Sequence, residues 1–279
     1  MRRKLLLLVG LLVIILTAIC LKSRSMGKAS VIFLNRQEGQ KIFDRPLVMS
    51  LIRSYRYKES VVRSGGVVTD RSAYRDHMID FYKQAVLEFT QEEKQSLLQL
   101  IMLDPRLCDE IWTFLKIGSH VDWGFPFTLE NVVVLPENVL QSIGTLTAKT
   151  LRHECIHIKQ RKHQNEYDEY YKNSLGYRKS KKLQIPLSII ENTVTNPDGP
   201  DVNWIKKVGD DWYWSALMLQ DGTEKPRGLA WKCIVNENES DVTVTKTFVP
   251  LTELAFAFDG HSNTYHPNEF VASLLSTYQ

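Results

Sequence analysis

The chain has 279 residues, of which 43% are hydrophobic and 24% are charged, and its formal net charge is +3. A chain of this length can bury a large core in one domain or in a domain of two lobes. The excess of basic over acidic residues comes from residues 1–30, which hold six basic residues and no acidic one. The other residues carry 35 − 6 = 29 basic and 32 acidic side chains, a net charge of −3. We therefore expect no nucleic-acid partner.

The N-terminus has the pattern of a membrane anchor. Arg2-Arg3-Lys4 precede residues 5–21, which contain no charged side chain. As a helix this segment spans about 25 Å, at the short end of what crosses a bilayer. It is long for a cleaved signal peptide, and Thr17-Ala18-Ile19-Cys20 is a poor cleavage site. We predict that residues 1–22 form a retained single-pass anchor, or else a signal segment, with the domain extracytoplasmic or lumenal.

The next part of the chain predicts a linker followed by helices. Residues 23–73 hold only short apolar runs, which favours a membrane-proximal linker with at most one or two strands. From Tyr74 apolar residues recur at helical spacings, and Thr90-Gln91-Glu92-Glu93 spells a capping box that begins a second helix. Asp104-Pro105 predicts a third helix, which would run to residue 118. These helices would be the helical half of a domain at residues 74–279.

Strands are predicted on both sides of the middle of the chain. Val132, Val133 and Val134 belong to a β-branched run that ends at Pro136. Further strands at residues 212–219, 230–235 and 242–248 would form an antiparallel sheet in the second half. Asn196-Pro197-Asp198-Gly199-Pro200-Asp201 is a turn cluster. We expect it to be a surface loop rather than part of a cleft.

The pattern H-E-x-x-H occurs at His153, Glu154 and His157, in a stretch without Pro or Gly from residue 145 to residue 173. Residues four apart on a helix are separated by about 40° around its axis, so both imidazoles project from one face and can bind one Zn²⁺. Glu154 lies about 100° from His153, where it can take a proton from a water on the metal. Apolar residues at helical spacing would face the core: Ala148, Leu151, Cys155 and Ile158.

A catalytic zinc site needs a third protein ligand. His163 has the metzincin spacing from His153, but Gln160 stands where that pattern requires Gly, and Met218 is the only nearby candidate for the methionine below the metal. The favoured ligand is Glu269, in the first turn of a terminal helix that Pro267 would begin and that would reach about Thr277. The remaining alternatives are His261, His266 and Asp259.

Several stretches of the chain together resemble an uncharacterised group of gluzincin-type zinc metallopeptidases, over about residues 75–279. The matching stretches are Phe125-Pro126-Phe127-Thr128, Val132–Pro136, the H-E-x-x-H helix with Gln160-Arg161, and His266-Pro267-Asn268-Glu269. Asn268-Glu269-x-x-Ala272 also resembles the second gluzincin motif. The 112 residues from His157 to Glu269 exceed the usual gluzincin separation, which implies a β-rich insertion.

The resemblance implies an α+β zincin-like domain behind the N-terminal anchor: a helical half, an edge strand, the active-site helix and an antiparallel β-rich second half. It implies Zn²⁺ held by His153, His157 and Glu269, with Glu154 as general base. It implies an oxyanion donor, for which Tyr265 is preferred over His261 and His266. Val132, Val133 and Val134 would be the edge strand that pairs with peptide substrate.

The function expected from these residues is hydrolysis of peptide bonds in a peptide or protein substrate by a membrane-anchored zinc peptidase. The alternative is a membrane-anchored binding or structural protein whose zinc site is structural or decayed. A structural zinc is normally closed by four protein ligands. A fourth ligand such as His261 or His266 would therefore favour the alternative.

Overall fold

The computed structural model describes residues 30–104, 106, 107, 111–141, 143–199, 201–219, 225–236, 241–258 and 265–278. The predicted anchor at residues 1–22 lies outside this part of the chain, as do Asp259 and His261. Among the helices that the structure describes, none has both the length and the apolar character needed to span a membrane.

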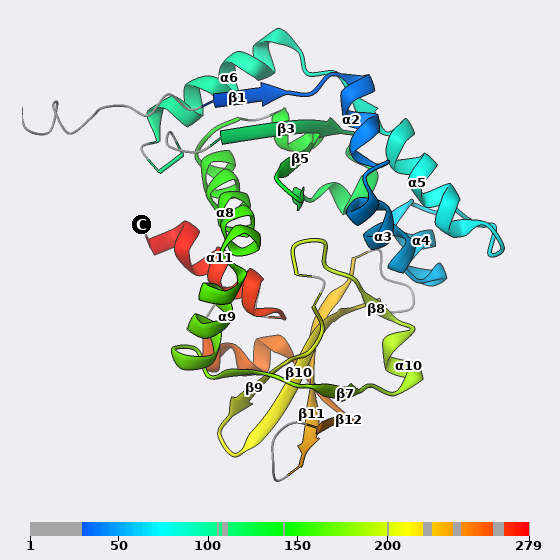
Figure 1. Ribbon diagram of the computed structural model, residues 1–279, viewed down its shortest axis with the longest axis vertical. Coiled ribbons are helices and arrows are strands. Elements are labelled where there is room, and N and C mark those ends of the chain that lie inside the picture. Colours follow the sequence, from blue (N-terminus) through cyan, green and yellow to red (C-terminus); the bar gives the residue numbers. More distant parts are fainter. Residues whose placement is uncertain are drawn as a thin grey trace, which may run out of the picture.

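The fold is of the α+β class and is built on two sheets (Figure 1). The first sheet has the order β1-β3-β5-β4, with β2 paired to β3. Its strands are β1 (Ser30–Phe33), β2 (Val86–Leu87), β3 (Ile111–Ile117), β4 (Phe127–Leu129) and β5 (Val132–Pro136). β1, β3 and β5 are parallel, whereas β4 runs antiparallel to β5. The antiparallel strand β4 is therefore an edge of this sheet.

Short helices surround the first sheet (Figure 1). They are α2 (Arg36–Ile42), α3 (Pro46–Ser54), α4 (Tyr57–Arg63), α5 (Tyr74–Gln84), α6 (Gln91–Leu103), η1 (Val121–Gly124) and α7 (Glu137–Leu140). The predicted capping box at Thr90 is confirmed, because its hydroxyl accepts from the Glu93 N–H and the Glu93 carboxylate accepts from the Thr90 N–H. α6 begins directly after this cap.

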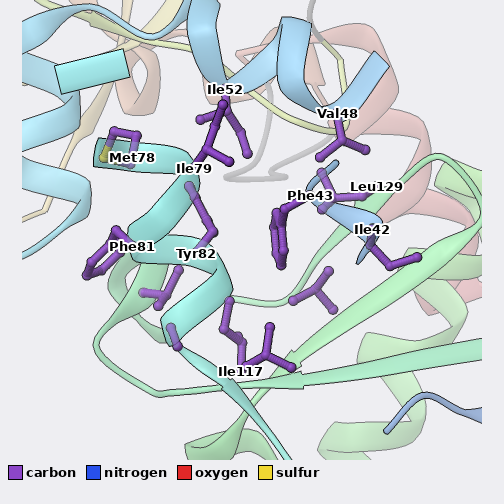
Figure 2. Close-up of a cluster of buried hydrophobic side chains, with 14 of the residues drawn as sticks. Ile42, Phe43, Val48, Ile52, Met78, Ile79, Phe81, Tyr82, Ile117 and Leu129 are labelled. Carbon is purple, nitrogen blue, oxygen red and sulfur yellow. The ribbon is translucent and has the colours of Figure 1, made fainter. Parts of the chain in front are cut away.

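Side chains of β5 alternate between two hydrophobic cores. Val132 and Val134 pack in a core with residues of α2, α3 and α5, among them Ile42, Ile52 and Tyr82 (Figure 2). Val133 and Leu135 pack with α6 and α8 (Thr145–Lys162) on the other face. A strand buried on both faces needs apolar side chains at every position. This explains the uninterrupted apolar run that identified the strand in the sequence.

The second sheet lies below the first in the view of Figure 1 and has the order β6-β9-β10-β11-β12-β7, with β8 paired to β10. Its strands are β6 (Tyr177–Lys179), β7 (Lys182–Gln184), β8 (Thr193–Val194), β9 (Trp204–Val208), β10 (Asp211–Met218), β11 (Arg227–Val235) and β12 (Asp241–Pro250). The pairs along β9–β12 are antiparallel, which confirms the predicted sheet. The remaining helices are α9 (Gln164–Asn173), α10 (Leu187–Ile190), η2 (Leu251–Phe258) and α11 (Pro267–Tyr278).

Two predictions about the first half of the chain are wrong. The expected linker at residues 23–73 instead supplies β1 and α2–α4 from residue 30 onward, and Phe43, Ile52 and Tyr55 are core residues. The expected third helix up to residue 118 is instead β3, a central strand of the first sheet. A run such as β3, buried on both faces, lacks the alternation that distinguishes a strand from a buried helix.

Candidate metal centre

The helix α8 lies beside the first sheet and runs toward α9 and α11 (Figure 1). Leu151 and Cys155 are buried in the core shared with the first sheet, as their spacing predicts, while Ile156 packs with the core of the second half. His153 and Glu154 line a cleft of about 580 Å³. The apolar positions thus fix the rotation of α8, which turns His153 and Glu154 toward the cleft and leaves His157 fully buried behind them.

Glu269 reaches the same point from α11. This helix begins at Pro267, and Phe270, Val271 and Ala272 bury its apolar face in the core of the second half. The guanidinium of Arg152 on α8 also donates to the carbonyl of Ser276 near the end of α11 (3.2 Å). These contacts hold α11 against α8, with Glu269 in its first turn facing the two imidazoles.

The three predicted ligands converge. Nε2 of His153 lies 3.0 Å from Nε2 of His157 and 3.2 Å from Oε2 of Glu269, and Nε2 of His157 lies 3.4 Å from Oε1 of Glu269. Ligands about 2.0–2.1 Å from a tetrahedral Zn²⁺ are separated from each other by about 3.3 Å. The spacing of the donors and the His₂Glu composition therefore fit one zinc ion.

Gln160 determines which nitrogen of His157 faces the other donors. Its amide Nε2 donates to the carbonyl of Asn268 (2.9 Å), so its Oε1 is turned to Nδ1 of His157 at 2.8 Å. Because this oxygen can only accept, Nδ1 of His157 carries the proton and Nε2 offers its lone pair to the site. From the sequence, Gln160 was noted as a departure from the metzincin pattern and as part of a stretch that resembles the gluzincin-type group, but it was given no orienting role. The overlooked signal is an amide one helical turn after a ligand histidine.

Burial and charge act differently on the three donor side chains. Burial acts to lower the pKa of His153, but the hydrogen bond and the charge of Glu269 outweigh it and raise this pKa to about 9. Burial lowers the pKa of His157, so this imidazole is neutral at pH 7. Burial acts to raise the pKa of Glu269, but the two imidazoles, His157 first, hold it far below its ordinary value. The centre therefore holds an ionised carboxylate ready for a cation.

Glu154 lies beside the three donors and has an unused oxygen. Its side chain is 3% exposed, and its Oε2 is buried with no hydrogen-bond partner among the described residues. Burial, and next the neighbouring charge of Asp198, raise the pKa of Glu154 well above its ordinary value. A buried carboxylate oxygen without a donor is costly. It fits a site that receives a water or a substrate group.

The turn cluster at residues 196–201 is not the plain surface loop that the sequence favours. Nδ2 of Asn196 donates to Oε1 of Glu269 (2.9 Å), and Asn196, Pro197 and Asp198 line the cleft. Nδ2 of Asn268 donates to the carbonyl of Asp198 (2.8 Å), which ties the turn to α11. No sequence pattern distinguished these side chains from those of an ordinary turn.

Val132, Val133 and Val134 do not form the edge strand, so their predicted contact with substrate is wrong. β5 is paired on one side with β3 and on the other with β4, and all three valines are fully buried. The edge is β4, whose Phe127 lines the cleft together with Phe125 and Pro126. The sequence identified the strand but could not show that a second, three-residue strand would cover it.

Of the remaining candidates Tyr265, His266, His163 and Met218, only Tyr265 lines the cleft. Burial followed by the Glu269 charge raises the pKa of Tyr265 well above its ordinary value, which keeps its hydroxyl protonated. His266 has both ring nitrogens engaged, with the Asp201 carbonyl (2.8 Å) and the Asn268 N–H (3.1 Å). His163 ends α8 and contacts Glu166 near the surface, and Met218 packs in the core of the second sheet.

Comparison with known proteins identifies no relative: no family model, no curated protein and no solved structure matches this chain. The functional argument therefore depends on the residues of the site and their geometry.

Proposed function

We propose that this protein is a zinc-dependent peptidase of the gluzincin type, with His153, His157 and Glu269 as the metal ligands. The observation that carries the proposal is the convergence of these three donors beside the unpartnered Glu154 oxygen, at the wall of a cleft. Zn²⁺ bound there would polarise a carbonyl group and lower the pKa of a coordinated water to about 7.

The side chains around the centre then have separate roles. Glu154, with its raised pKa, accepts the proton of the attacking water and passes it to the leaving amine. Tyr265 keeps its hydroxyl proton and is placed in the cleft lining, where it can donate to the oxygen of the reacting carbonyl. Gln160 and Asn196 do not react; they orient His157 and Glu269. An anchor at residues 1–22 would attach this catalytic unit to a membrane.

The rival function, a non-catalytic protein with a structural zinc, has less support. A structural site would need a fourth protein ligand. His266 is engaged elsewhere through both ring nitrogens. Asp198 lies near His157, but its Oδ1 is held by the Thr128 N–H and by Arg161, and it is not grouped with His153 and Glu269 around one point. A cleft that is open to the metal ligands favours catalysis over a closed structural site.

Substituting Glu154→Gln tests this proposal. The variant keeps all three donors, so we expect an unchanged content of one zinc per chain. We expect hydrolysis of a mixed peptide library to fall by about 10²-fold to 10⁴-fold, because the general base is lost. Metal content would be measured by mass spectrometry of the purified protein, and hydrolysis by product analysis.

The matched control is Glu166→Gln, which changes an exposed acid on α9 and should leave both quantities unchanged. Unaltered turnover in the Glu154→Gln variant would end the assignment of Glu154 as the base. A protein that binds no zinc would end the proposal as a whole.

A further inference from the structure

Side chains of the protein itself occupy the edge of β4 beside the cleft. The backbone N–H of Thr128 donates to Oδ1 of Asp198 (2.9 Å), and the Thr128 carbonyl accepts from Nη2 of Arg161 (3.1 Å). The preceding edge residue, Pro126, has no N–H. A peptide added to a sheet edge needs these free backbone groups. An extended substrate therefore cannot continue along β4 past Thr128.

Both terminal nitrogens of Arg161 are engaged by the protein itself near this edge. Its Nη2 also donates to the carbonyl of Pro197 (3.0 Å) and to Oδ1 of Asp198 (3.1 Å). Its Nη1 donates to the Thr128 hydroxyl and to the carbonyl of Glu130 (3.3 Å). Thus the terminal nitrogens of this guanidinium bind the edge strand and the cleft-lining turn of the protein itself.

Two buried carboxylates line the cleft beside this edge. Glu154, His157 and Asp198 each offer an atom within 4.8 Å of the others, and Glu154 and Asp198 are 3% and 6% exposed. Arg161 offsets one negative charge, but Oε2 of Glu154 has no hydrogen-bond donor in the part of the chain that the structure describes. Paired carboxylates beside an unpartnered buried oxygen favour a bound cation with N–H donors. An ammonium group has this chemistry.

We propose that the cleft takes peptides by a free α-amino group, which lies between Asp198 and Glu154 and places the first carbonyl against the metal ligands. This rests on the proposed peptidase function and makes it an aminopeptidase. The α-nitrogen and the carbonyl carbon of one residue are about 2.5 Å apart. Asp198, Glu154 and His157 offer atoms within 4.8 Å of one another, so the carbonyl next to an amino group bound there would lie beside the proposed metal ligands.

The reaction removes one amino acid in each cycle. The oxygen of a water molecule adds to the first carbonyl carbon, and Glu154 takes its proton. The bond from this carbon to the next nitrogen breaks, and the leaving nitrogen receives the proton from Glu154. The products are a free amino acid and a peptide shortened by one residue. The rest of the substrate would leave along α8 in the other direction, toward the exposed Lys149 and the end of α11, which also line the cleft.

The experiment compares three substrates on the zinc-loaded full-length protein in detergent. They are a short peptide with a free amino terminus, the same peptide with an acetylated terminus, and a longer internally quenched peptide blocked at both ends. We expect stepwise release of N-terminal residues from the first. We expect kcat/KM for the acetylated peptide to be lower by about tenfold to 100-fold, because a charged hydrogen bond is lost. No cleavage of the blocked peptide is expected.

The outcomes separate this inference from the proposed function. Internal cleavage of the blocked peptide at a comparable rate would overturn the aminopeptidase assignment and leave the peptidase proposal standing. Absence of hydrolysis with all three substrates would overturn both.

Asp198→Asn gives a second test on the same substrates. The amide keeps an oxygen for the Thr128 N–H but loses the negative charge, so we expect the preference for the free amino terminus to fall by about tenfold. A purely structural effect would lower both rates and leave their ratio unchanged, which would count against the proposal. The matched control is Asp201→Asn, an acid of the same turn that pairs with Lys179 outside the cleft lining.

Discussion

His153 and His157 project from one face of one helix, yet their surroundings give them different charges before a metal binds. The carboxylate of Glu269 accepts from His153 and raises its pKa to about 9, whereas burial lowers the pKa of His157. At neutral pH the metal-free centre therefore holds one imidazolium and one neutral imidazole. Zinc binds only the neutral form of either ring.

This difference predicts the pH dependence of zinc binding. Because the pKa of His153 lies above neutrality, its proton must leave when zinc enters, and His157 contributes none. We expect log affinity to rise by about one per pH unit between about pH 6.5 and 8.5 and to level off above pH 9. Calorimetry in buffers of different ionisation enthalpy would report release of about one proton. Affinity independent of pH over this interval would show that His153 is neutral in the metal-free protein.

Between elements, the contact of α8 with α11 determines whether the three donors meet. Gln160 spans this contact, since its amide holds the His157 ring at one end and the Asn268 carbonyl, next to Glu269, at the other. One partner is a proposed metal ligand, His157, and the other is the residue before a second one, Glu269. A group that orients a ligand in this way typically changes metal affinity by about 10-fold to 100-fold when it is removed.

Replacing Gln160→Leu should therefore weaken zinc binding by about 10-fold to 100-fold while α8 stays helical. Leucine fills the buried space but leaves Nδ1 of His157 and the Asn268 carbonyl without their partner. The control is Gln164→Leu, an exposed position in the first turn of α9. Zinc affinity would be measured by competition with a chelator, and circular dichroism would monitor the helix. Equal affinities for the two variants would contradict the orienting role.

On the scale of the whole molecule, Arg63 joins the helices near the N-terminus to the wall of the cleft. Its guanidinium donates to Glu59 (2.9 Å), to Asp122 in the turn before β4, and to the carbonyl of Thr195 in the cleft-lining turn. Asp122 has φ of 47° and also accepts from the Tyr82 hydroxyl (2.7 Å). The segment that the sequence predicted to be a linker thus supports the site.

Substituting Arg63→Ala should lower the free energy of unfolding by about 3–5 kcal/mol, because two buried carboxylates lose their cation. The control is Arg53→Ala, which breaks the exposed pair with Asp76 and should cost about 1 kcal/mol or less. Urea unfolding followed by tryptophan fluorescence would measure both. A cost for Arg63→Ala no greater than that of the control would show that the buried cluster contributes little to stability.

Patterns that act over a few residues were read correctly from the sequence. The capping box at Thr90, the proline that begins α11 and the helical spacing of His153 and His157 depend on the chain within one or two turns. The capping box at Asn35, with Glu38 three residues later, was equally visible and would have shown that the supposed linker is folded. Local hydrogen bonding and the helical period determine these features, so the sequence alone contains them.

Tertiary packing alone decided the rest. The sheet order places β4 at the edge and β5 inside. This order depends on how strands of similar apolar character pair with one another. The contact of Asn196 with Glu269 and the hydrogen bond of Asp198 to the Thr128 backbone each join residues that are 70 or more positions apart. The spacing of residues along the chain carries no signal for such contacts, because they form only when whole elements pack. The sequence therefore determined the donors of the candidate centre, and the fold determined what surrounds them.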